Sequence, residues 1–153
     1  MLARELARPF PTVGLDSSAL EAARVLAEQR LPGLIVLGPD GLPHTVLPGS
    51  QVLRFLVPAY VQDDPALARA FDEKSADELS AKLEGRTVRE VLPKKPDRLE
   101  IPLVEPDATA IEIAALMTGM RSPIVAVVDG TELLGAVTIS VLLDHLLAGG
   151  AAS

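Results

Sequence analysis

The amino-acid sequence predicts an α/β (α+β) fold in which two pseudo-symmetric β-α-β-β-α motifs pack into one module, with a helical insert between them. The first observation is an internal repeat. When residues 11–37 are laid over 102–128, a spacing of 91, nine of 27 positions are identical, against about two expected by chance. The second observation is that both copies show the same order of helix caps, aliphatic runs and turn residues.

Each copy begins with a short extended segment and continues as a helix. The helix starts carry the pattern Ser/Thr-x-x-Glu, at Ser18 to Glu21 and at Thr109 to Glu112. In this pattern the hydroxyl accepts a backbone N–H three residues later. A proline soon after each apolar stripe ends the helical pattern. The expected elements are extended segments over 11–15 and 101–104 and helices running to about Gln29 and Gly119.

The second half of each copy predicts two strands and a closing helix. Continuous aliphatic runs are typical of strands that are buried on both faces. Gly-containing turns follow these runs and predict hairpins. The expected strands are 34–37 and 45–47 in the first copy and 124–128 and 133–137 in the second, and the closing helices are 50–57 and 140–147.

The repeat divides the chain into a first motif over 1–57, an acidic helical insert over 58–87, a second motif over 88–148 and a frayed tail over 149–153. Within 58–85 the insert has seven acidic residues against three basic ones. Its pattern predicts short helices over 65–71 and 75–83, followed by a third over 87–92.

Composition excludes several classes of function. The 153 residues include no cysteine, which removes disulfide frameworks, thiolate metal sites and cysteine nucleophiles. A net charge of −7 and an aromatic content of 3% argue against nucleic acid as the main partner. No apolar run reaches the length of a membrane span, and no signal-peptide core is present, so we expect a cytoplasmic protein.

Catalytic and metal motifs are missing from the sequence. The two histidines, His44 and His145, lie outside any ligand pattern, and no nucleophile elbow or phosphate loop is found. We therefore expect no enzymatic activity, no catalytic residues and no metal site.

The duplicated motif resembles the cystathionine-β-synthase (CBS) domain family, whose tandem motifs form a Bateman module. The stretches that carry the resemblance are 108–117, 121–130 and 134–143. The resemblance implies a stand-alone bacterial-type regulatory module that forms homodimers through its helices. It also implies adenosine-type nucleotide or S-adenosylmethionine binding in clefts between the motifs, and regulation of a partner enzyme or transporter.

The resemblance also implies where a ligand binds. The family signature is Gly-h-h-Thr/Ser-x-x-Asp, where h is apolar, the hydroxyl meets phosphate and the Asp meets the ribose. The second motif keeps Gly135 and Thr138 but has Val141 at the Asp position, and the first motif has Gln51 there. Neither motif therefore has the ribose carboxylate. Carrying the family's sites over gives these candidate ligand-binding residues: Pro102, Pro123, Ile124, Gly135, Thr138, Val141, Pro32, Pro48, Gln51 and Lys95.

Each candidate also has a purely structural interpretation. Thr138 is a good helix cap, the prolines are ordinary at strand entries, and Lys95 lies in a basic loop. Arg30 and Arg121 recur at the repeat spacing, and positive charge at a helix end explains them as well as a phosphate clamp does. Two functions stay open: a ligand-sensing regulator, or a degenerate pair that acts as a structural, dimerisation or adaptor module. For both functions, the small residues at 22–27 and 114–115 would allow helices to approach closely at a homodimer interface.

Overall fold

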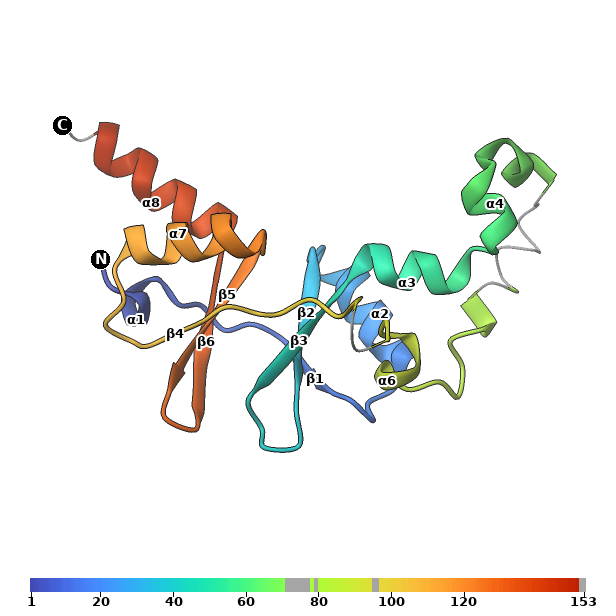
Figure 1. The fold of residues 1–153 in the computed structure, drawn as a ribbon, viewed down its shortest axis with the longest axis horizontal. Coiled ribbons are helices and arrows are strands. Elements are labelled where there is room, and N and C mark those ends of the chain that lie inside the picture. Colours follow the sequence, from blue (N-terminus) through green and yellow to red (C-terminus); the bar gives the residue numbers. More distant parts are fainter. Residues whose placement is uncertain (71–77, 79, 95–96, 152–153) are drawn as a thin grey trace. The chain divides into compact units, whose positions relative to one another are not determined.

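The duplicated sequence folds into two three-stranded sheets, one from each copy of the repeat (Figure 1). The computed structural model describes residues 1–70, 78, 80–94 and 97–151. The sheets have the orders β1-β2-β3 and β4-β5-β6. In the second sheet β4 pairs parallel with β5, and β5 pairs antiparallel with β6. The strands are β1 (Thr12–Gly14), β2 (Gly33–Leu37), β3 (Pro43–Pro48), β4 (Leu103–Val104), β5 (Ile124–Asp129) and β6 (Glu132–Thr138).

Helices alternate with these strands as the repeat predicts. The hydroxyl of Ser18 accepts the N–H of Glu21 at 3.2 Å, and that of Thr109 accepts the N–H of Glu112 at 3.2 Å, so both expected caps are confirmed. The helices are α1 (Ala3–Leu6), α2 (Ala19–Glu28), α3 (Gly49–Leu56), α4 (Ala59–Asp63), the 3₁₀ helix η1 (Pro65–Ala70), α6 (Val88–Val91), α7 (Ala110–Met120) and α8 (Ile139–Ala151).

The chain divides into two units, which do not coincide with simple halves of the sequence. Unit 1 contains 1–12, 37–45 and 99–153, and unit 2 contains 13–36 and 46–98. The core of unit 1 lies between one face of β4-β5-β6 and the helices α7 and α8. Its buried members include Val104, Val125, Val127, Val137, Ile113, Met117 and Leu142, together with Ala3 and Leu6 of α1.

Unit 2 is built in the same way from α2, α3 and the strands of the first copy. Its core is completed by α6, whose Val88 and Val91 are no more than 1% exposed. The backbone N–H of Val88 donates to the carbonyl of Ser17 at 2.9 Å. Each short helix, α1 or α6, therefore packs against the copy of the repeat that it does not immediately precede.

The insert is attached to the end of α3 by side chains. Lys82 Nζ donates to the carbonyl of Leu56 at 3.1 Å, and Gln62 Nε2 donates to the carbonyl of Val57 at 2.7 Å. These contacts satisfy carbonyls that the last turn of a helix leaves unpaired. The helix expected over 65–71 appears as η1 over 65–70, and of the helix expected over 75–83 residues 75–77 and 79 lie outside the described residues.

The second closing helix is longer than its counterpart. Helix α8 continues to Ala151, into the segment where the sequence favoured a frayed tail from 149. Within the described residues no helix has the length and apolar character that crossing a bilayer requires.

Candidate functional site

In unit 1 the structure brings four candidate residues together where β6 ends and α8 begins. Ile124 and Thr138 are paired across β5 and β6, and the carbonyl of Pro123 accepts the N–H of Ile139 at 3.3 Å. Thr138 is half-buried, and its hydroxyl oxygen accepts the N–H of Val141 at 3.4 Å. The hydroxyl thus caps α8, and its own proton is still available to a ligand.

Val141 lies at the position where the family has its ribose-binding carboxylate. Its side chain is half-buried and packs against the core of unit 1. An apolar side chain held in this way offers no acceptor to a diol. Val141 therefore cannot take the part of the carboxylate that the resemblance implies at this position.

The first copy repeats the arrangement in unit 2. The carbonyl of Pro32 accepts the N–H of Gly49 at 3.2 Å, matching the contact between Pro123 and Ile139 in the other copy. Pro48 precedes α3 without a side-chain cap. Gln51 Nε2 donates to the carbonyl of Val91 at 2.9 Å, so this amide ties α3 to α6.

The other candidates lie apart from these two places. Pro102 is buried just before β4, and its carbonyl accepts the N–H of Ala126 at 3.0 Å. Gly135 is three residues before Thr138 and faces the N-terminal segment, because a Cβ there would lie 2.7 Å from the carbonyl oxygen of Arg8. Close packing therefore explains this glycine without any ligand. Lys95 lies outside the described residues.

Two arginines occupy an unusual backbone conformation after α2 and α7. Arg30 has φ 52° and Arg121 has φ 51°, in the left-handed region that glycine adopts more easily. At Arg121 the backbone N–H closes α7 by donating to the carbonyl of Met117. Both copies therefore end this helix in the same way, with an arginine in the left-handed conformation.

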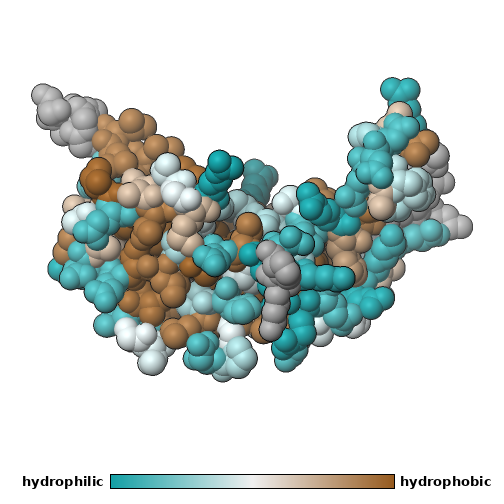
Figure 2. Space-filling view, in the orientation of Figure 1, coloured by the Kyte–Doolittle hydropathy of each residue, from teal (hydrophilic) through white to brown (hydrophobic). Residues whose placement is uncertain are grey.

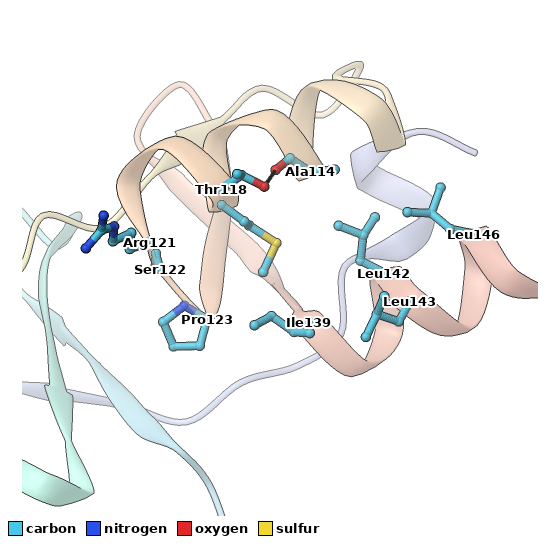
Figure 3. A pocket seen from close by; sticks show the side chains of 10 residues that line it. Ala114, Thr118, Arg121, Ser122, Pro123, Ile139, Leu142, Leu143 and Leu146 are labelled. Atoms are coloured by element: carbon cyan, nitrogen blue, oxygen red, sulfur yellow. Dashed lines mark hydrogen bonds between the residues drawn. The ribbon is translucent and has the colours of Figure 1, made fainter.

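A groove between α7 and α8 was not expected from the sequence (Figure 3). It has a volume of about 480 Å³. The hydroxyl of Thr118 donates to the carbonyl of Ala114 at 2.9 Å and that of Ser122 donates to the carbonyl of Ile124 at 2.7 Å, so two of its polar groups are already bonded. The groove is lined by Ala114, Met117, Thr118, Arg121, Ser122, Pro123, Ile139, Leu142, Leu143 and Leu146.

The groove belongs to a wider apolar surface on unit 1. Ile139, Leu143 and Leu147 on α8 are 46%, 49% and 69% exposed. Apolar residues cover the part of the surface that carries α8 (Figure 2). The signal was present in the sequence, because the spacing i, i+4, i+8 forms a second apolar stripe beside the buried one.

One charged side chain, that of Arg121, lines the groove. Ion pairs elsewhere on the surface include those of Arg24 with Glu21, Arg86 with Glu90 and Arg89 with Asp16, all between exposed side chains. The described ranges hold no group of three or more His, Asp or Glu side chains that suits a metal ion. The site at Thr138 thus consists of a hydroxyl, backbone groups and apolar side chains.

Comparison with known proteins agrees with this architecture. The family model for the CBS domain matches residues 88–148. A CBS domain-containing protein of unknown function from Kribbella flavida is 53% identical, with a TM-score of 0.87, and the match covers 96% of this chain and 99% of that one. No curated protein is significantly similar to the chain.

Two more distant structures share the fold. The CBS domain of a CBS domain-containing membrane protein from Sphaerobacter thermophilus is 22% identical, with a TM-score of 0.68 and coverage of 94% of this chain and 86% of that one. CBSX2, whose structure is a complex with AMP, is 15% identical, with a TM-score of 0.66 and coverage of 97% and 98%. Neither the family model nor these structures indicate an enzyme family. The tandem motifs, their sheets and the similarity to the Kribbella protein lead to one conclusion: the chain belongs to the CBS-domain family.

Proposed function

We propose that this chain is a non-catalytic, cytoplasmic regulatory protein that binds an adenosine-type nucleotide or a related ligand beside Thr138. The observation that carries the proposal is the position of the Thr138 hydroxyl. A partly exposed hydroxyl lies at the start of α8, beside the strand entry at Pro123 and Ile124. A hydroxyl at a helix N-terminus suits phosphate, because backbone N–H groups and the helix dipole favour an anion there.

The AMP complex of CBSX2 supports the ligand class, since that protein has the same fold. In this chain the phosphate would meet Thr138 and the base would meet backbone and apolar groups near Pro123. The missing carboxylate predicts weaker ribose binding than in proteins that have it. Regulation would follow by population shift, because a ligand that binds one arrangement more tightly favours that arrangement.

A second function is a structural or adaptor module that binds no ligand. The observation in its favour is that side chains at both candidate sites already have roles within the fold. Gln51 donates a hydrogen bond to the carbonyl of Val91, Thr138 caps α8, and Val141 packs against the core. In that case the protein would act through its surfaces alone.

We also propose that the protein is a homodimer, in keeping with either function. The support is the apolar surface of α7 and α8, where Leu147 is 69% exposed beside a groove of about 480 Å³. Burying such side chains against a second copy would stabilise the pair, by roughly 25 cal/mol for each Å² of apolar area removed from water.

Thermal shift measurements test ligand binding. The probes are AMP, ADP, ATP, guanine nucleotides and S-adenosylmethionine at millimolar concentration. We expect an adenine nucleotide to raise Tm for the wild type, and the Thr138→Val variant to lose most of that shift. The matched control is Thr131→Val, because Thr131 is exposed in the β5–β6 turn. A wild type that no probe stabilises would favour the adaptor function instead.

A further inference from the structure

Residues 1–8 form a short segment of unit 1, which we call the N-terminal strap. Its helix α1 places Ala3 and Leu6 in the core of this unit, where they are 0% and 1% exposed. The N–H of Ala3 also donates to the carbonyl of Ala108 at 2.8 Å, directly before the capping residue of α7. Because four residues are too few for a helix to be stable alone, the strap depends on these contacts to stay docked.

The other end of the strap supports the outer edge of β6. This strand is the last of the second sheet, so β5 pairs with only one of its edges. On the outer edge Arg8 and Ala136 exchange two backbone hydrogen bonds of 3.0 Å, which form an isolated bridge. Gly135 makes this contact possible, since a Cβ there would lie 2.7 Å from the Arg8 carbonyl oxygen.

The bridged residue lies close to the candidate site along the strand. Ala136 is two residues before Thr138, and the two are opposite Ala126 and Ile124 of β5. Their side chains lie on the same face of the sheet, because side chains alternate along a strand. The position of the Thr138 hydroxyl depends on the path of β6 into α8. The strap fixes this path from the outer edge, so the loss of the bridge would leave Ala136 paired on one edge only.

The strap has few anchors in the core. Its buried side chains are those of Ala3 and Leu6, and its other side chains are at least partly exposed. Segments that bury little apolar surface open locally at a lower free energy than the rest of the core. Docking of the strap is thus an equilibrium that a ligand can shift.

We propose that the N-terminal strap positions the ligand site at Thr138, and that strap docking and ligand binding stabilise each other. This inference rests on the proposed ligand function and adds a regulatory element to it. Coupling between two equilibria is reciprocal, so a strap that increases the affinity for a nucleotide is itself held more firmly when the nucleotide is bound. A partner or condition that removes Arg8 from β6 would therefore release the nucleotide.

Amide hydrogen exchange of the full chain, followed by NMR, measures the docking of the strap. AMP is the probe, and ATP replaces it if AMP does not bind. We expect a saturating nucleotide to slow exchange at the amides of Ala3 and Arg8 about fivefold, at the lower end of typical coupling between sites. The amide of Gln29, which donates to the carbonyl of Val25 in unit 2, is the control and should exchange at an unchanged rate.

Two variants of Arg8 test the effect of the bridge on affinity. Arg8→Pro removes the N–H that donates to Ala136, and Ala7 before it is already extended, as a residue before proline needs to be. Arg8→Ala removes the same side chain and keeps the N–H. In calorimetric titration we expect Arg8→Pro to bind the nucleotide about fivefold more weakly, by the reciprocity of coupling, and Arg8→Ala to bind like the wild type. Circular dichroism shows whether each variant is folded, and the exchange measurement on the wild type tests the coupling without any variant.

The outcomes separate this inference from the proposed function. A wild type that binds neither AMP nor ATP overturns both together. A wild type that binds one of them, but whose strap amides exchange at the same rate with and without it, overturns the coupling and leaves the ligand function standing. Equal affinity of folded Arg8→Pro and Arg8→Ala has the same meaning.

Discussion

The hydroxyl of Thr45 donates a hydrogen bond of 2.6 Å to the carbonyl oxygen of Leu99 within unit 1. Thr45 corresponds to Gly135 in the repeat, and Leu99 corresponds to Arg8. In the second copy the same junction is made by backbone alone, because Arg8 and Ala136 exchange two N–H···O bonds of 3.0 Å. The equivalent contact is therefore made by the Thr45 side chain in one copy. In the other copy it is made by backbone groups, which approach closely because Gly135 has no side chain.

Replacing Thr45 by valine is expected to destabilise the protein by about 1–2 kcal/mol. Thr45 is 1% exposed, and valine keeps its shape while leaving the Leu99 carbonyl without its donor. Urea unfolding monitored by circular dichroism measures the change. The exposed Thr131→Val serves as the control, and an equal effect in both variants would contradict the role of this hydrogen bond.

Two glycine-to-alanine changes are expected to act in opposite directions. Gly135→Ala should cost about 1–3 kcal/mol, because the new Cβ would lie 2.7 Å from the Arg8 carbonyl oxygen and the N-terminal segment must move away from β6. Gly119→Ala in α7 meets nothing within 4 Å and should gain about 0.5–1 kcal/mol through helix propensity. Unfolding free energies of the two variants, measured side by side, test this. A neutral Gly135→Ala would mean that the close approach to Arg8 is not maintained in solution.

The left-handed arginines predict stabilising substitutions. Arg30→Gly and Arg121→Gly should each raise the free energy of unfolding by about 0.5–1 kcal/mol, since glycine adopts a φ near 50° without the steric cost of a Cβ. Arg24→Gly, inside α2, is the opposite control and should cost about 1 kcal/mol. Chemical denaturation compares the three variants. Destabilisation at Arg30 or Arg121 would show that their side chains contribute more than the backbone costs.

Glu90 predicts a pH-dependent contribution to stability. The hydrogen bond from Arg86, followed by the backbone N–H of Thr87, lowers the pKa of Glu90 below its ordinary value of 4.5. The charged form is favoured in the folded state, so the contribution is fully present above pH 4.5 and is lost as pH falls through the folded-state pKa.

Urea unfolding of the wild type and Glu90→Gln at pH 7 and at acidic pH measures this contribution. We expect the stability difference between the two proteins to shrink as the solution is acidified. Carboxyl NMR titration of Arg86→Gln should place the pKa of Glu90 closer to 4.5. An unchanged pKa in that variant would contradict the assigned cause.

Local patterns in the sequence were sufficient for most of the fold. The caps at Ser18 and Thr109 and the aliphatic runs at 34–37 and 124–128 depend on neighbours in the chain, and the structure has them. The helix α1 and its place in the core of unit 1 were not predicted, because four residues carry too little periodicity to reveal a partner about a hundred residues away.

The candidate site was predictable to a lesser degree. The repeat predicts that Thr138 lies near Pro123 and that Gln51 lies near Pro32. In each copy these residues stand at the same positions of the central strand and of the start of the closing helix. The structural roles of Gly135 and Gln51 could not be predicted, because each contacts backbone far away in the sequence. Gly135 lies against the carbonyl of Arg8, and Gln51 donates to the carbonyl of Val91. The groove was missed because only a folded α7 shows which side of α8 remains open.

The placement of α1 has a consequence for synthesis on the ribosome. Unit 2 uses residues between 13 and 98, so all of its parts have been made when α6 emerges. Ala3 and Leu6 precede unit 2 in the chain and pack with β6 and α8, which follow it. Helix α1 therefore remains undocked on the ribosome while unit 2 is completed, and it reaches its place in the core only after β6 and α8 have been synthesised.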